Sequence, residues 1–211
     1  MFRLALLPLL LSVGVGIASA STLRINFQSN GAPIPEGYFP DYGAAFGDRG
    51  NGWSYGWDVD NTANTRDRNN PVAPDQRYDT NNNFHLINVD QVDRIWEVAL
   101  PDGIYNVFMV CGDASFTDQV NTLDVEGRVV EDPDGYDNYD RYEVTVEVTD
   151  GRLTIKPAAG SSNSKICFVD ITSDLLTAFF VKATAPDPAD GAEAVAFSVP
   201  PRSFLGHTVR G

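Results

Sequence analysis

Three aromatic side chains alternate along one polar stretch of the chain, a spacing suited to stacking on a flat ligand. Trp53, Tyr55 and Trp57 occupy every second position, so an extended backbone would place their rings on one side. Sugars present C–H faces that stack on such rings, while carboxylate, amide and guanidinium groups bind their hydroxyls. Groups of these kinds follow at once, at Asp58, Asp60, Asn61, Arg66, Asp67 and Arg68. The pattern indicates a carbohydrate site. The alternatives are that the rings form the inner face of a strand, and that the Arg66–Asp67–Arg68 cluster is an ion-pair brace.

Two acidic stretches are candidates for calcium. Asp58, Asp60 and Asn64 alternate as in a calcium loop, but the central Gly is missing and Asn69 stands where an EF-hand needs a bidentate Glu. The second stretch has five carboxylates within ten residues, and a calcium ion there would relieve their repulsion. They are Glu131, Asp132, Asp134, Asp137 and Asp140. A solvated acidic turn is the alternative, and no other cofactor is expected.

Residues for catalysis are scarce. His85 and His207 are the only histidines, and His207 lies in a predicted tail, which leaves His85 as the one candidate imidazole for a nucleophilic triad. No GxSxG elbow is present, and the GDAS sequence at 112–115 lacks the leucine that follows the serine motif of secreted esterases. Paired carboxylates for glycoside hydrolysis are decided only by their separation in space. We therefore expect a protein that is not an enzyme, with a hydrolase or esterase as a lower-ranked alternative.

The N-terminus has the features of an export signal. Arg3 precedes an apolar run that ends at Ala18-Ser19-Ala20, a small-x-small cleavage pattern, so residues 1–20 are predicted to be a signal peptide. The run is short for a bilayer span, so a secreted or cell-surface protein without membrane association after cleavage is expected, with an uncleaved anchor as the alternative. In an oxidising compartment the two cysteines, Cys111 and Cys167, are free to pair. Each shares the parity of predicted core residues on its strand; buried free thiols are the alternative.

The net charge of the chain bears on which classes of partner it can bind. The chain has 211 residues and a formal charge of −14, from 29 acidic and 15 basic side chains. No cluster of Lys and Arg of the kind that displaces counterions from phosphate backbones is present, which argues against nucleic-acid binding. With 43% hydrophobic and 21% charged residues, the composition is ordinary for a globular protein, so the chain is expected to fold. After removal of residues 1–20 the chain is long enough for one hydrophobic core.

Short alternating segments separated by Gly, Pro, Asn and Asp predict an all-β domain over residues 21–184. Asp150-Gly151 and Pro101-Asp102-Gly103 are expected to close hairpins. The run 104–111 is apolar on both faces and predicts a central strand, whereas 142–148 has one solvated face. The expected strands are 23–27, 96–100, 104–111, 121–127, 142–148, 153–155, 165–171 and 178–183. Together they predict a jelly-roll-like antiparallel β-sandwich, with a barrel as the alternative.

Two further regions differ from this pattern. Residues 30–83 are polar and rich in Gly, Asn and Pro, yet they contain many aromatics, so we expect a long ordered loop that packs over one end or face of the sandwich. Residues 185–211 change to Ala, Pro, Asp and Gly and are expected to be a linker or a truncated tail, possessing too few residues for a second core.

The order and spacing of six sequence blocks resemble malectin and malectin-like domains of the galactose-binding-like jelly rolls. The blocks span most of residues 22–172: INF (25–27), YGW (55–57), RYDT (77–80), WEVALPDGIYNV (96–107), GDASFTDQVNTLDVEG (112–127) and KICFVDI (165–171). The version with RDR (66–68), RYDT and YGW looks like modules attached to secreted polysaccharide-degrading or surface proteins of bacteria, which implies that the chain could be a fragment of a larger modular protein.

The resemblance implies a non-catalytic sugar-binding role, with aromatics on loops at one edge of the sandwich. By position, Tyr55, Tyr78 and Phe116 match the family's stacking rings. Ser115 replaces an adjacent aromatic, and Ser162 replaces an expected acid, so a different polar set is implied: Asp113, Asp118 and Asn163. The predicted function is a secreted glycan- or polysaccharide-binding module. The alternative is a structural or surface-interaction module, calcium-stabilised, without sugar binding.

Overall fold

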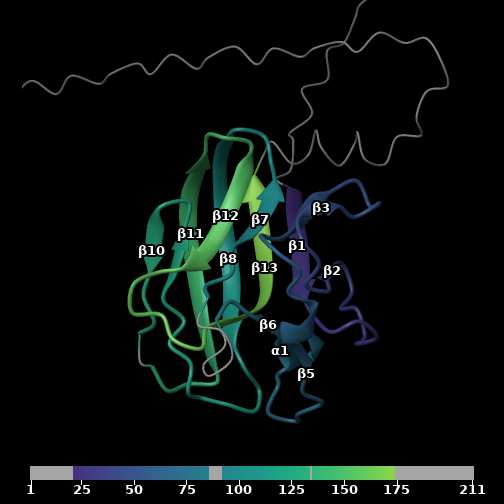
Figure 1. The fold of residues 1–211 in the computed structure, drawn as a ribbon, viewed down its shortest axis with the longest axis vertical. Coiled ribbons are helices and arrows are strands. Elements are labelled where there is room, and N and C mark those ends of the chain that lie inside the picture. Colours follow the sequence, from purple (N-terminus) through teal and green to yellow (C-terminus); the bar gives the residue numbers. More distant parts are fainter. Residues whose placement is uncertain (1–20, 86–91, 134, 174–211) are drawn as a thin grey trace, which may run out of the picture.

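The computed structural model describes residues 21–85, 92–133 and 135–173. They form a β-sandwich whose two sheets lie face to face (Figure 1). The predicted signal peptide, the expected strand 178–183, the 185–211 tail and Asp134 lie outside the described residues. No helix in the described ranges is long and apolar enough to cross a bilayer.

Thirteen strands make up the two sheets in the described part of the chain. The main path of the seven-stranded sheet has the order β11 (Tyr139–Val148), β8 (Gly103–Gly112), β13 (Lys165–Ser173), β1 (Ser21–Phe27), β2 (Phe39–Asp41). Two further strands extend this sheet: β6 (Thr80–Asn83) pairs with β13, and β5 (Thr65–Asp67) pairs with β6. The six-stranded sheet has the order β10 (Arg128–Val130), β9 (Leu123–Val125), β12 (Arg152–Pro157), β7 (Trp96–Ala99), β4 (Ser54–Trp57), β3 (Gly47–Asp48). The pairs are antiparallel except β1 with β2. A 3-10 turn, η1 (Thr62–Asn64), and one short helix, α1 (Gln76–Asp79), complete the elements. The predicted sandwich is confirmed.

Strand periodicity explains the core between the sheets. Alternate residues of β1 and β8 point inward and meet those of β7 and β12 from the other sheet. Val107, Val98 and Ile155 are fully buried there, and each such side chain stabilises the fold by about 1.5–3 kcal/mol. As expected, β8 is a central strand, and β11 alternates between buried and solvent-facing residues.

The two predicted hairpins are not hairpins. Asp150-Gly151 joins β11 to β12, and Pro101-Asp102-Gly103 joins β7 to β8, but each pair belongs to different sheets. The two turns instead lie side by side: Gly151 N donates to Asp102 Oδ1 at 2.9 Å, and Leu100 N donates to Gly151 O at 3.0 Å. The turn residues have the right chemistry, but the two strands at each turn belong to opposite layers and turn their buried faces into the same core, so the chain crosses from one layer to the other.

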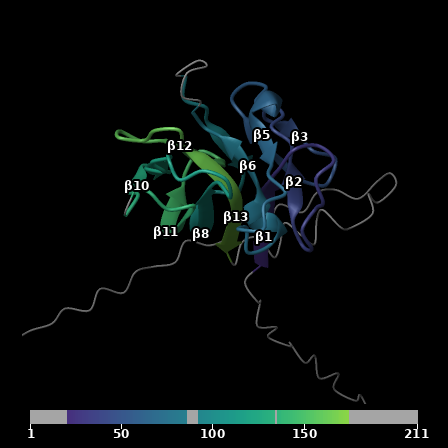
Figure 2. The same ribbon diagram turned by 90° about the horizontal axis from the view of Figure 1, so that it is seen from below.

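The segment 30–83 is ordered, as predicted, but it is not one long loop over the sandwich: it adds strands to both sheets. Its first part supplies β2, β3 and β4, and its second part supplies β5 and β6. Ser21 pairs with Ser173 at one end of the sandwich, whereas Asn83 pairs with Lys165 at the other. Figure 2 views the molecule from this second end and shows β5 and β6 beside β13. The candidate site lies here.

Cys111 and Cys167 are both free and fully buried, so the predicted disulfide is absent. Cys111 belongs to the core between the sheets, whereas Cys167 packs on the opposite face of the seven-stranded sheet with Val110 and Phe168. A β-bulge between Ile166 and Phe168 shifts the register of β13 against β8. The bulge breaks the alternation on which the parity argument depended, because a bulge adds one residue to a strand.

Candidate functional site

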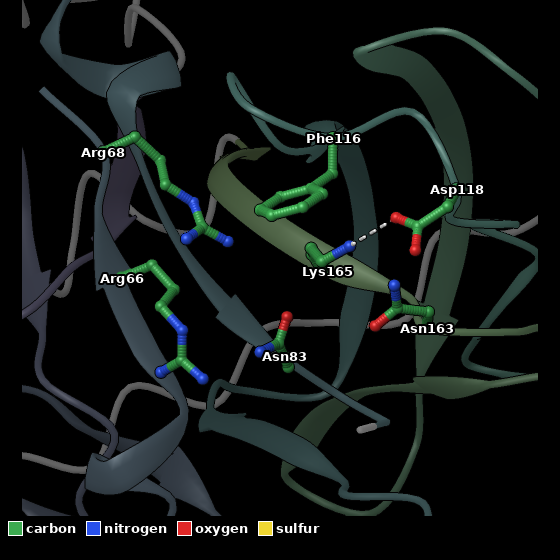
Figure 3. A pocket seen from close by; sticks show the side chains of 7 residues that line it. All are labelled: Arg66, Arg68, Asn83, Phe116, Asp118, Asn163 and Lys165. Carbon is green, nitrogen blue, oxygen red and sulfur yellow. Dashed lines mark ion pairs between the residues drawn. The ribbon is translucent and has the colours of Figure 1, made fainter. Parts of the chain in front are cut away.

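A hollow of about 270 Å³ opens where β5, β6 and the start of β13 meet the connection from β8 to β9. Its lining is polar and cationic around a single aromatic ring, as Figure 3 shows. The lining residues are Arg66, Arg68, Asn83, Phe116, Asp118, Asn163 and Lys165. It is a little smaller than the roughly 300–1,000 Å³ typical of sites for drug-sized molecules, so it suits a small ligand.

Sheet register brings the lining side chains together. Arg66 lies in β5 and Arg68 follows that strand directly, so side chains two positions apart on an extended backbone point to the same side. Arg66 pairs with Asn81 of β6, and the next strand across places Asn83 opposite Lys165. Three neighbouring strands thus present their polar residues at one end of the sheet.

Arg68 is fixed by a buried ion pair. Its Nε donates to Asp113 Oδ1 at 2.8 Å and its Nη2 donates to Asp113 Oδ2, while the Asp113 side chain is fully buried. Asp113 also accepts from Ser115 N at 2.9 Å. The bidentate pair holds the guanidinium against Phe116, with Cζ 5.0 Å from the ring centroid. Phe116 remains 49% exposed at the hollow.

A close backbone approach positions Asp113. The preceding Gly112 has a φ of +133°, and a Cβ on it would lie 2.0 Å from Asn138 O. Asp113 N donates to the same carbonyl at 2.8 Å. Only glycine allows this contact, so the chain can turn from β8 and direct Asp113 at Arg68.

Lys165 is an almost buried cation, with 4% of its surface exposed. Its Nζ donates to Gln119 Oε1 at 3.2 Å and lies 3.8 Å from Asp118 Oδ1, an ion pair drawn in Figure 3. Burial lowers the pKa of Lys165 below its ordinary value, although Asp113 and Asp118 act in the opposite direction. The amide of Gln119 is itself held by Asp137 O at 2.8 Å.

Two amides complete the hollow. Asn163 has a φ of +52°, a left-handed conformation that asparagine tolerates better than most residues. Asn83 donates from Nδ2 to Asn64 O at 3.3 Å, and its buried Oδ1 has no hydrogen-bond partner among the described residues. Figure 3 shows that this oxygen points toward the middle of the hollow.

Three of the residues predicted for a ligand site line this hollow, namely Phe116, Asp118 and Asn163. A fourth, Asp113, lies behind it and orients Arg68. These four come from two segments far apart in the sequence, which the fold brings to one end of the seven-stranded sheet.

The predicted stacking role of Trp53, Tyr55 and Trp57 is wrong. Their exposed fractions are 2%, 1% and 0%, because β4 pairs with β7 and turns these rings into the core between the sheets. Trp57 Nε1 donates to the buried Asp41 Oδ1 at 3.1 Å, and Tyr55 OH donates to Pro40 O at 2.9 Å. The polar side-chain atoms of Tyr55 and Trp57 are thus satisfied inside the protein. The alternating rings are the inner face of a strand, which was the alternative interpretation.

Tyr78 does not reach the hollow either. Its side chain packs on the outer face of the seven-stranded sheet, edge-on to Tyr139 at 5.0 Å and to Phe168 at 5.2 Å between ring centroids. The guanidinium groups of Arg77 and Arg141 lie 5.6 and 5.5 Å from its centroid. Tyr78 is only 8% exposed, because these neighbouring side chains cover its ring.

Sequence reasoning missed Asn83 and Lys165 as site residues, and gave Arg66 and Arg68 only as neighbours of the rings. The two-residue spacing of the arginines was a usable signal, since it predicts a shared face once the backbone is extended. Nothing in the local sequence marks Asn83 or Lys165. Their meeting depends on the pairing of β6 with β13, across 82 residues of chain.

The predicted calcium stretches are organised by hydrogen bonds to backbone N–H groups. Asp58 accepts from Ile95, Asp60 from Thr62 and Asp132 from Gly135. Within the described ranges, no three His, Cys, Asp or Glu side chains converge as a metal site requires. Calcium binding stays a prediction. His85 Nδ1 lies 2.9 Å from Asp93 Oδ1, outside the hollow lining.

No protein-family model and no curated protein sequence matches the chain. Solved structures similar to it include protein YXIM_BACsu from Bacillus subtilis, at 22% identity, TM-score 0.49, with 72% of this chain and 40% of that chain covered. A β-glucuronidase 2 from Bacteroides uniformis matches at 16% identity and TM-score 0.44, over 72% of this chain and 17% of that one. A family 35 carbohydrate-binding module from Clostridium thermocellum matches at 10% identity and TM-score 0.25, over 37% and 68%. The chain spans 40% of the length of the first of these and 17% of the second.

Proposed function

We propose that this chain is a secreted, non-catalytic carbohydrate-binding module and that the hollow at Phe116 is its ligand site. The observation that supports it is one half-exposed ring set among amides, a carboxylate and guanidinium groups. An exposed ring offers a surface for a sugar C–H face, and the surrounding polar groups offer partners for its hydroxyls. The export signal expected at residues 1–20 would place the module where glycans are found.

The groups at the hollow support binding without turnover. Glycoside hydrolysis needs two carboxylic groups flanking the bond. Asp118 is the one carboxylate among the described lining residues, and the nearby Asp113 is engaged in both oxygens by Arg68. The unpartnered Oδ1 of Asn83 is an acceptor suited to a hydroxyl, not a nucleophile.

A glycan-array screen of the full chain, followed by calorimetry on the saccharides bound, tests the proposal. Phe116→Ala removes the ring and should weaken binding by about tenfold or more, as truncation of an aromatic anchor does. Val129→Ala is the matched control, because Val129 is similarly exposed, at 56%, on β10. Binding that survives Phe116→Ala unchanged would place the ligand elsewhere.

A structural or surface-interaction module is the second candidate. It is favoured by the burial of Trp53, Tyr55 and Trp57, which serve the fold. If no saccharide binds the intact chain, this second function replaces the first. Repeating the screen with calcium and with a chelator also tests the calcium prediction.

A further inference from the structure

The hollow concentrates positive charge in an acidic protein. It takes three of the chain's 15 Lys and Arg side chains, Arg66, Arg68 and Lys165, although the chain as a whole carries −14. At physiological ionic strength, charges further apart than about 8 Å are largely screened. The distant surface acids therefore contribute little at the hollow, and the local groups decide which ligand is attracted.

Two of the three cations have acidic partners and the third does not. Arg68 is paired with Asp113, and Lys165 lies 3.8 Å from Asp118. No carboxylate pairs with Arg66 in the part of the chain that the structure describes. The immediate set thus has three cations against two anions, and the excess charge is on Arg66.

Arg66 is held in place while part of its guanidinium is left unused. Its Nη1 donates to Ala63 O at 2.9 Å and to Thr65 O at 2.8 Å. These bonds leave the Nε and Nη2 edge without a partner among the described residues, and two parallel N–H groups on such an edge match a carboxylate. Burial and the neighbouring Arg68 lower the pKa of Arg66, although Asp113 acts in the opposite direction, so an anion bound directly to Arg66 would further stabilise its charge.

We propose, on the basis of the carbohydrate-binding function above, that the ligand is an acidic saccharide and that Arg66 receives the carboxylate of a uronic-acid unit. Phe116 would take the C–H face of the ring, and Asp118, Asn83 and Asn163 its hydroxyls. Figure 3 shows how these groups lie: both arginines enter from the left, Asp118 and Asn163 lie opposite them, Phe116 lies above the middle of the hollow and Asn83 below it.

The test compares matched ligands on the full chain by calorimetry. Oligosaccharides of glucuronic and of galacturonic acid are each titrated beside their methyl esters, which keep the ring and hydroxyls but remove the charge. The expected result is binding of one acid about tenfold or more tighter than its ester, as for a charge-assisted hydrogen bond. The acid's affinity should also fall as salt is raised.

Arg66→Gln should bring acid and ester to equal affinity, while Arg66→Lys, which keeps the charge but not the fork, should retain part of the difference. Arg128→Gln on β10 is the control and should change neither. The melting temperature of each variant is measured alongside, so that misfolding is recognised. If Arg66→Gln does not fold, the Arg66→Lys variant and the comparison of acid with ester on the unaltered chain still test whether a carboxylate is bound.

The outcomes separate the two proposals. An ester that binds as tightly as its acid overturns the acidic ligand and leaves carbohydrate binding intact. Binding confined to sulfated glycans overturns the assignment of a carboxylate. Binding of neither acids, esters nor neutral glycans overturns carbohydrate binding itself.

Discussion

Arg66 in β5 and Arg68 just after it enter the same hollow, but only Arg68 of the two has an acidic partner in the described part of the chain. Asp113 fixes Arg68 from behind, and Arg68 in turn lies against Phe116. One arginine is therefore held by a carboxylate, whereas the described residues use only Nη1 of the other. The two roles are separable by mutation.

Asp113→Asn should destabilise the fold by about 3 kcal/mol, because it leaves the guanidinium of Arg68 without the charge that compensates its burial. Chemical denaturation gives the difference in free energy of unfolding. Asp75→Asn is the control, since the Asp75–Arg77 pair is solvent-exposed and should contribute less than about 1 kcal/mol. Equal losses in the two variants would contradict the structural role of the Arg68–Asp113 pair.

Lys165 gives the hollow a pH dependence. Burial lowers the pKa of its ammonium below the ordinary 10.5, so the folded protein loses this proton at a lower pH than the unfolded chain. From that lowered pKa up to 10.5, the unfolded state binds more protons, and the free energy of unfolding should rise with pH. The affinity for an acidic saccharide should fall over the same window, because a cation disappears from the site.

Lys165→Met isolates this effect. The variant should bind the acidic saccharide more weakly at pH 7 and show no further loss as the pH rises toward 10.5. Tyr38 and Tyr105 do not confuse the measurement, because burial raises the pKa of each to about 12. Calorimetric titrations at several pH values check the prediction, and parallel curves for the variant and the unaltered chain would refute it.

Substitution of Trp57 tests whether the alternating aromatic residues serve the core or a ligand site. Trp57→Phe removes the Nε1 donor to Asp41 and leaves space between the sheets, so stability should fall by about 2–3 kcal/mol. Affinity for a bound glycan should stay within twofold, since Trp57 does not line the hollow. A variant that keeps its stability but loses binding would return these rings to the ligand site.

Periodicity and turn residues predicted the sandwich, the central strand 104–111 and the solvated face of 142–148. They did not predict which strands pair. Asp150-Gly151 has the residues of a hairpin turn, yet it joins two layers, because layer crossing depends on the burial of both strands in one core. For the same reason Trp53, Tyr55 and Trp57 could not be assigned: alternation shows that they share a side, not what covers it.

The residues that line the hollow were likewise predicted only in part. Phe116, Asp118 and Asn163, which line one hollow, were predicted together with the malectin-like resemblance. Asn83 and Lys165 were missed, because only the pairing of β6 with β13 makes them neighbours. The predicted disulfide depended on strict alternation along β13. The bulge between Ile166 and Phe168 interrupts that alternation, so the thiol of Cys167 lies on the opposite face of the sheet from Cys111.

The two thiols give the last prediction. Both are fully buried, and burial raises the pKa of each well above its ordinary value, so neither is reactive in the folded protein. A thiol reagent should label no cysteine in the native state and both after unfolding, and added reductant should leave the melting temperature unchanged. Protein purified under oxidising conditions is the stringent sample. If it yields no free thiols on unfolding and melts at a lower temperature with reductant, Cys111 and Cys167 are bonded and the prediction of two free thiols is wrong.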